Sequence, residues 1–201
     1  MIIKEDKNEI NVSIVGDYYT GKTTIFNSIF GKNLEKDETT ISIERRKKVI
    51  EINEIKYTLN IYDTPGYDYK IYEKLIAIKY SDIIILVYNT NQFSTFEEIK
   101  YLFDDDKQKG NYQYQIWLNI YQEKIRGPEN NNKVFGLLGN KFNDKDSFND
   151  AQEEEIKKFS NSIDAKTTKM YKGEFINEFL EELLVLYLHK NELCNHKYIN
   201  Y

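Results

Sequence analysis

The stretch GDYYTGKTT, residues 16–24, has the residue types and the spacing of a phosphate-binding loop. Gly16 and Gly21 have no side chains, so the backbone N–H groups between them can approach an anion closely. Lys22 can neutralise the β- and γ-phosphates of a nucleotide, and the Thr23 hydroxyl can bind Mg²⁺. The pattern predicts nucleotide binding by the whole loop: Gly16, Asp17, Tyr18, Tyr19, Thr20, Gly21, Lys22, Thr23 and Thr24.

A second short motif, DTPG at residues 63–66, follows a predicted strand. The Asp63 carboxylate could hold Mg²⁺ through water, and the Gly66 N–H could meet a γ-phosphate. Taken alone, the motif would be read as a simple Pro-Gly turn. Its order and distance from the phosphate loop favour the functional interpretation.

The elements around these motifs predict an α/β sheet whose strands are connected across helices. A strand over 9–15 runs into Gly16, and the apolar spacing of 23–30 predicts a helix directly after the loop. Further strands are expected at 41–52, 55–63, 81–89 and 133–138, and further helices at 116–125, 153–159 and 174–190. Only two residues separate the strands 41–52 and 55–63, so these two should form an antiparallel hairpin.

The middle of the first hairpin strand, Arg45 to Lys48, carries four successive charges and should be solvated on both faces. A charged edge strand that resists aggregation is the favoured interpretation, and a partner-binding patch is the alternative. The polar segment around 100–115 is expected to be a surface insertion within a single domain spanning 1–201.

Composition narrows the class of protein. A chain of 201 residues can bury one sizeable core, and its net charge of −5 argues against nucleic acid as a partner. The single cysteine, Cys194, cannot form an internal disulfide, which fits a cytoplasmic protein. No apolar stretch approaches the roughly 20 residues needed to cross a bilayer.

The chain resembles the Ras-like small GTPases, most closely their Rab and Rho branches, and the matching motifs occur in the order that the family has. The resemblance rests on GDYYTGKTT, Thr40 in ETTISIE, DTPG, SDIIILVYNTNQFSTFEEI, GNKFN and DAK. It implies a P-loop fold with a mostly parallel six-stranded sheet, one antiparallel edge strand and flanking helices. It also implies Mg²⁺ and GTP or GDP as ligands of a monomeric protein.

The resemblance further implies roles for individual residues. Segments 31–40 and 64–72 would be the two switches, which bind effector, exchange-factor and activating proteins. The catalytic residues would be Lys22, Thr40, Gly66 and Tyr67; the Mg²⁺ ligands would be Thr23, Thr40 and Asp63; and the base would be bound by Asn140, Lys141, Asn143, Asp164, Ala165 and Lys166.

Several residues depart from the family pattern. Asn143 stands where the family has an aspartate that accepts from both guanine N–H groups, which could weaken guanine binding by roughly tenfold to a hundredfold. Tyr67 stands where the family commonly has the glutamine that orients the attacking water, and Tyr18 occupies a loop position that is usually small. The two tyrosines predict slow hydrolysis.

The leading expectation is a divergent guanine-nucleotide switch, in vesicle traffic or cytoskeletal signalling as the two branches imply. The alternative is a nucleotide-binding or partner-binding module that does not hydrolyse, and a P-loop kinase or ATPase is a third, weaker alternative. The ending INY is no prenylation signal, and Ile2 excludes myristoylation, so the expectation is either that the protein has no lipid anchor or that this chain is part of a longer one.

Overall fold

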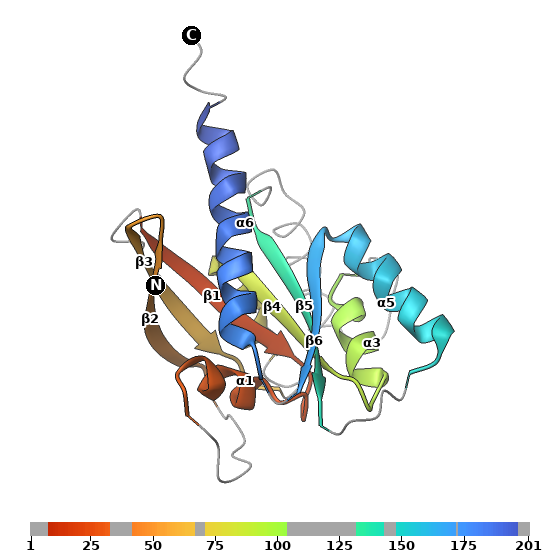
Figure 1. The fold of residues 1–201 in the computed structure, drawn as a ribbon. Coiled ribbons are helices and arrows are strands. Elements are labelled where there is room, and N and C mark those ends of the chain that lie inside the picture. The colour runs from red at the N-terminus through yellow and green to blue at the C-terminus, as the bar shows by residue number, and fades with distance from the viewer. Residues whose placement is uncertain are drawn as a thin grey trace.

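The computed structural model of the protein describes residues 8–32, 42–66, 71–103, 132–142, 148–171 and 173–196 (Figure 1). Its strands are β1 Glu9–Gly16, β2 Glu44–Ile52, β3 Ile55–Asp63, β4 Ile83–Asn89, β5 Val134–Lys141 and β6 Ala165–Tyr171. Its helices are α1 Lys22–Ile29, α2 Ile71–Tyr80, α3 Ser94–Tyr101, α5 Asp150–Ser162 and α6 Ile176–His196. The expected helix at 116–125 and most of the expected insertion lie outside the described residues.

The strands form one six-stranded sheet in the order β2-β3-β1-β4-β5-β6. Every neighbouring pair is parallel except β2 and β3, which are antiparallel. The predicted fold class is confirmed, as is the hairpin. Its two turn residues, Asn53 and Glu54, both have positive φ (50° and 67°), as a tight two-residue hairpin turn requires.

Two apolar layers cover the sheet, and β4 contributes to both because alternate side chains of a strand point to opposite faces. Ile83, Ile85 and Val87 pack with α1 and α6 on one face. Ile84, Leu86 and Tyr88 pack with α2, α3 and α5 on the other. Figure 1 shows α6 lying across the first face. The prediction of a central strand covered on both sides is thus confirmed.

The charged strand β2 is an edge of the sheet, as predicted, but its charged run is not solvated on both faces. The Arg46 guanidinium lies 4.8 Å from the ring centroid of Phe26, and it donates to Asn27 Oδ1 at 2.9 Å. Lys48 Nζ donates to the carbonyl oxygen of Ile29 at 2.9 Å. The prediction failed here because long charged side chains can cover an apolar helix with their stems.

Helix α5 begins earlier than its acidic residues suggested. Asn149 caps it: its side chain accepts from the backbone N–H of Gln152, whose own side chain accepts from the backbone N–H of Asn149. This reciprocal capping box satisfies two N–H groups at the helix start. Along the described ranges, no helix is both long enough and apolar enough to span a membrane.

The parallel arrangement fixes where a site can form. Strands β3, β1, β4, β5 and β6 all run in one direction, so their carboxyl ends meet at one edge of the sheet. In open α/β sheets, ligands bind in the crevice outside this edge.

Candidate nucleotide-binding site

The phosphate loop connects the end of β1 to the start of α1, as the sequence predicted. A Cβ atom on Gly16 would lie 2.2 Å from the carbonyl oxygen of Val87 on β4, so only glycine fits there. Gly21 has a φ of 81°, and a Cβ atom on it would lie 2.2 Å from Asn140 Nδ2. The loop therefore lies close against the ends of β4 and β5, at the amino terminus of a helix, where anions bind favourably.

Lys22 lies inside this loop, with only 6% of its surface exposed. Its Nζ donates to the carbonyl oxygen of Asp17 at 2.6 Å and lies 3.4 Å from Thr20 Oγ1. Burial lowers the pKa of Lys22 to about 8, and the positive charge of Lys74 lowers it further, against the opposing effect of the Asp63 and Asp17 carboxylates. A buried cation held by neutral oxygens is well placed to receive an anionic ligand.

This lowered pKa predicts a pH dependence of stability. Between about pH 8 and 10.5 the folded state binds fewer protons at Lys22 than the unfolded state does, so its stability rises with pH in that window. Relative to a Lys22→Met variant, the nucleotide-free parent should gain up to about 1.4 kcal/mol of unfolding free energy per pH unit. Urea unfolding of both proteins between pH 7.5 and 10 measures this. A constant difference between them would contradict the expectation.

The two predicted Mg²⁺ ligands that the structure describes lie together. Thr23 Oγ1 donates to Asp63 Oδ2 at 2.7 Å, and Asp63 is fully buried at the end of β3. One hydroxyl and one carboxylate, completed by phosphate oxygens and water, form a donor set that suits Mg²⁺. The third predicted ligand, Thr40, lies outside the described residues.

Gly66 lies directly against the phosphate loop. A Cβ atom on it would lie 2.8 Å from Tyr18 Cα and 3.1 Å from Lys22 Nζ. The Thr64 hydroxyl, two residues earlier, donates to the carbonyl oxygen of Ile14 at 2.8 Å and ties the motif to β1. The structure thus brings the two predicted motifs together, while Tyr67 lies outside the described residues.

Lys74 of α2 also reaches Gly66, and sequence reasoning missed it. Its Nζ donates to the Gly66 carbonyl oxygen at 2.7 Å, and the residue is 5% exposed. The sequence offers no signal for this contact, since a lysine on a helix is most often solvated.

The end of β5 supports the loop from the other side. Asn140 is fully buried, and its Nδ2 donates to the carbonyl oxygen of Thr20 at 3.0 Å. Its Oδ1 is buried and has no hydrogen-bond partner among the residues that the structure describes. A polar ligand group at this end of the sheet could satisfy that atom, which fits the base-binding role expected for Asn140 and Lys141. Asn143 lies outside the described residues.

The expectation that Asp164, Ala165 and Lys166 bind the base is wrong. Ala165 pairs with Phe135 at the start of β5, whereas Asn140 pairs with Met170. At roughly 3.3 Å per residue, about 16 Å of strand separates the DAK segment from Asn140. Asp164 instead forms an ion pair with Lys190, and Lys166 forms one with Glu182, both on α6.

The carboxyl end of β6 lies beside Asn140 and Lys141 in place of DAK. Tyr171 pairs with Lys141, and the chain then turns through Gly173. Gly173 has a φ of 84°, and a Cβ atom on it would lie 2.8 Å from Ser28 Oγ of α1. The direction of the strand could have identified this end of β6, because in a parallel sheet a ligand-binding loop follows the carboxyl end of a strand and does not precede the strand.

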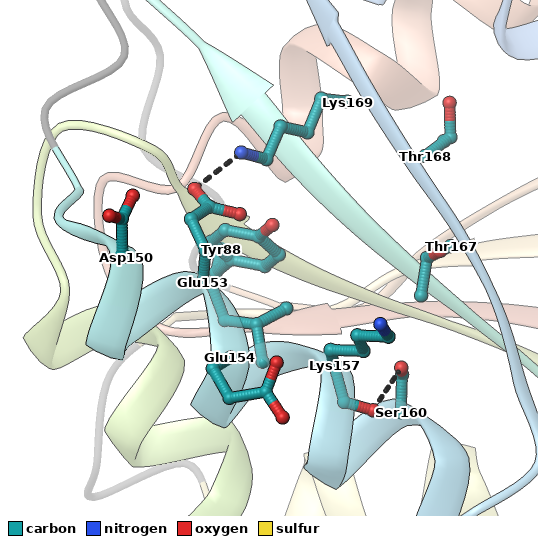
Figure 2. Close-up of a pocket in the computed structure, with 10 residues that line it drawn as sticks. Tyr88, Asp150, Glu153, Glu154, Lys157, Ser160, Thr167, Thr168 and Lys169 are labelled. Carbon is teal, nitrogen blue, oxygen red and sulfur yellow. Dashed lines mark hydrogen bonds and ion pairs between the residues drawn. The ribbon is translucent and has the colours of Figure 1, made fainter.

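A separate cavity of about 430 Å³ lies between α5 and β6 (Figure 2). Its charged lining includes the ion pair of Lys169 with Glu153, and Ser160 donates to the Lys157 carbonyl oxygen. No residue of the phosphate loop lines this cavity, so it is not the predicted nucleotide site.

The arrangement of a strand, a phosphate loop and a helix, with a buried carboxylate on the adjacent parallel strand, defines a P-loop nucleotide-binding domain. The Ras family model matches residues 11–181, and the chain belongs to the Ras family. Membership explains why Thr23, Asp63 and Gly66 gather at one loop.

Several curated relatives are similar over part of their length. The GTP-binding protein YPTC5 of Chlamydomonas reinhardtii is 26% identical over 138 residues, which cover 67% of this chain and 59% of that protein. RABG3f of Arabidopsis thaliana is 26% identical over 133 residues, 66% of this chain and 57% of that protein. Rab-32D of Dictyostelium discoideum is 26% identical over 110 residues, 54% of this chain and 48% of that protein. The matches thus span only about half of each relative or somewhat more.

Proposed function

We propose that this chain is a guanine-nucleotide-dependent switch that binds GTP and GDP with Mg²⁺ and hydrolyses GTP slowly. The observation that carries the proposal is the convergence of Lys22, Thr23, Asp63 and Gly66 on one loop at the carboxyl edge of the sheet. The family gives the nucleotide, since its members bind guanine nucleotides.

Each residue then has a defined task. The Lys22 ammonium group exchanges its hydrogen bond to the Asp17 carbonyl oxygen for bonds to the phosphates, whose charge it neutralises. The backbone N–H groups of the loop donate to phosphate oxygens. Thr23 and Asp63 hold Mg²⁺, which shields the phosphates and fixes their orientation. Gly66, which lies against Tyr18, senses the presence of a γ-phosphate.

The two switch segments, 31–40 and 64–72, are the proposed binding surfaces for effector, exchange-factor and activating proteins. Loss of the γ-phosphate would release Gly66 from the phosphate loop and change the surface that a partner meets. The names of the Rab relatives favour a role in vesicle traffic over cytoskeletal signalling.

Calorimetric titration of the nucleotide-free protein with GDP and with ADP, in the presence of Mg²⁺, tests the proposal. GDP is expected to bind and ADP to bind far more weakly. Equal binding of ADP would favour the ATPase alternative, and binding of neither nucleotide would remove the proposed function.

A second candidate function is a module that binds nucleotide without cycling. The observation in its favour is Tyr18, whose backbone lies under Gly66, where the family has a small residue. A rate of GTP hydrolysis no higher than that of a Lys22→Ala variant would select this candidate.

Base recognition gives a further prediction. Asn143→Asp should strengthen GDP and GTP binding by about tenfold to a hundredfold, because a carboxylate can accept from both guanine N–H groups. Titration with GDP measures the gain, and Asn161→Asp on the exposed end of α5 is the matched control for added charge. Unchanged affinity in Asn143→Asp would indicate that Asp144 already supplies the carboxylate.

A further inference from the structure

One large aromatic side chain at the nucleotide site takes no part in the core. Phe142 follows Asn140 and Lys141 at the end of β5, and 38% of its surface is exposed. It belongs to neither of the two apolar layers that the described residues form on the sheet. A single exposed phenylalanine is ordinary on a protein surface, so its position relative to the site decides whether it has a function.

The ring of Phe142 reaches the phosphate loop. A Cβ atom on Gly21 would lie 3.0 Å from Phe142 Cζ and 2.2 Å from Asn140 Nδ2, so the ring and the amide border the same point of the loop. Gly21 directly precedes Lys22, which is proposed to bind the phosphates. Phe142 therefore lies where the phosphate end of the site meets the end of β5.

The neighbouring amide indicates which part of a nucleotide comes to this point. Asn140 Nδ2 donates to the Thr20 carbonyl oxygen, but the buried Oδ1 has no hydrogen-bond partner among the residues that the structure describes. Leaving a buried acceptor without a donor is costly. A base or a ribose can donate to this oxygen, whereas ionised phosphates offer only acceptors. The nucleoside, and not the phosphate chain, is therefore expected beside Asn140.

A phenylalanine beside this acceptor suits the base better than the ribose. Phe142 has no polar side-chain atom that could bind the ribose hydroxyls. Every base has a π-face, and stacking of that face on an aromatic side chain stabilises binding whatever the identity of the base. A base in this position would also cover part of the Phe142 ring that is now exposed.

We propose that Phe142 is a base-stacking residue, which covers one face of the nucleotide base while the polar groups at the end of β5 select guanine. The inference rests on the proposed function and deepens it, since it assigns part of the nucleotide affinity to an apolar side chain. It differs from a structural role, in which Phe142 would only cover Gly21. A stack requires an aromatic ring, whereas covering the loop requires only an apolar side chain of similar size.

Dissociation constants for GDP with Mg²⁺, measured by calorimetry, provide the test. Phe142→Ala and Phe142→Leu should each bind GDP about tenfold or more weakly than the parent, because both lose the stack. Phe142→Tyr keeps the ring and should bind within about threefold of the parent. Tyr80→Ala, at a similarly exposed aromatic residue (43%) at the end of α2, is the matched control and should bind like the parent.

Phe142→Trp adds a spectroscopic measurement that a purely structural role would not change. Stacking of guanine on the added indole should quench its fluorescence, and the quenching should saturate at the dissociation constant that calorimetry gives. The parent, whose only tryptophan is Trp117, supplies the background signal.

The outcomes separate the two claims. If the parent does not bind GDP, the proposed function fails and the inference fails with it. If the parent binds GDP and Phe142→Leu binds it equally well, the ring is not required and only the inference about Phe142 is wrong. Equal losses in Phe142→Leu and Phe142→Tyr, or an unquenched indole in a Phe142→Trp protein that binds GDP, would also overturn it. Should Phe142→Ala fail to fold, the comparison of the Leu and Tyr variants decides.

Discussion

Replacing Lys22 by alanine is expected to reduce GDP and GTP affinity by roughly 10²- to 10⁴-fold. Hydrogen bonds to charged groups contribute about 1.5 to 3 kcal/mol each, and Lys22 would lose such bonds to two phosphates. The reason is specific to its position, since Lys22 is buried and its Nζ is held by loop oxygens rather than by a carboxylate. Titration calorimetry with Mg²⁺ and GDP measures the change.

A folding defect must be distinguished from a binding defect in this experiment. The nucleotide-free Lys22→Ala protein should remain at least as stable as the parent at neutral pH, because it no longer buries an ammonium group. GDP should raise the melting temperature of the parent but not that of the variant. Lys158→Ala, at an exposed lysine of α5, is the control and should bind like the parent. Parent-like GDP affinity in Lys22→Ala would show that the loop does not bind phosphate as proposed.

The parts of the fold that the sequence predicted well are those where one local pattern leaves few alternatives. The apolar run 83–87 is long enough to be buried on both faces, and the Asn53-Glu54 pair leaves room only for a tight hairpin turn. The phosphate loop was recognisable because its glycines occupy places that no side chain could fill. Residue types such as glycine indicate backbone geometry of this kind directly.

The segment expected to bind the base was harder to place from the sequence, because its motif is short and its strand is irregular. The sequence AKTTKMY of β6 is an edge strand with a single buried residue, Met170, so it shows neither a continuous apolar run nor a clean alternation. Because this strand could not be predicted from the sequence, the direction of the chain at Asp164 could not be inferred. The three residues DAK matched the family by type but lie at the wrong end of β6.

Lys74 and Arg46 show a second limit of sequence reasoning. Both are charged residues that pattern analysis assigns to solvent, yet Lys74 is buried at Gly66 and Arg46 lies over Phe26. Their positions depend on tertiary packing, because long charged side chains can extend toward partners distant in sequence. Contacts of this kind follow from the fold and cannot be inferred from spacing.

Hydrolysis of GTP by the isolated protein is expected to be slower than the roughly 10⁻⁴ s⁻¹ of an ordinary unassisted family member. Binding needs the backbone amides of the loop, and tyrosines leave these in place. Hydrolysis also needs space above the loop for the attacking water. A Cβ atom on Gly66 would lie 2.8 Å from Tyr18 Cα, so the Tyr18 side chain begins close to where a γ-phosphate would meet Gly66.

The neighbouring tyrosine is arranged differently. Tyr19 has a φ of 55° and is 65% exposed, although the centroid of its ring lies 3.7 Å from that of Tyr18. Tyr19→Gly therefore removes a ring of similar size from the same loop without clearing the space at Gly66, and glycine accepts the positive φ. This variant is the matched control and should hydrolyse GTP no faster than the parent.

The effects of replacing Tyr18 and Tyr67 on the rate of hydrolysis should be non-additive, because both residues act on the same water molecule. Tyr67→Gln alone should raise the single-turnover rate little, because Tyr18 still crowds the water that the glutamine would orient. Tyr18→Gly clears the space but leaves the water without a residue to align it. Tyr18→Gly with Tyr67→Gln should therefore exceed the combined effect of the two single changes, and about tenfold over the parent is expected, which corresponds to about 1.4 kcal/mol of barrier. Single-turnover measurements on the parent, the two single variants, the double variant and Tyr19→Gly decide the matter. A parent rate equal to that of an ordinary family member, or a double variant no faster than the better single one, would show that Tyr18 does not limit hydrolysis.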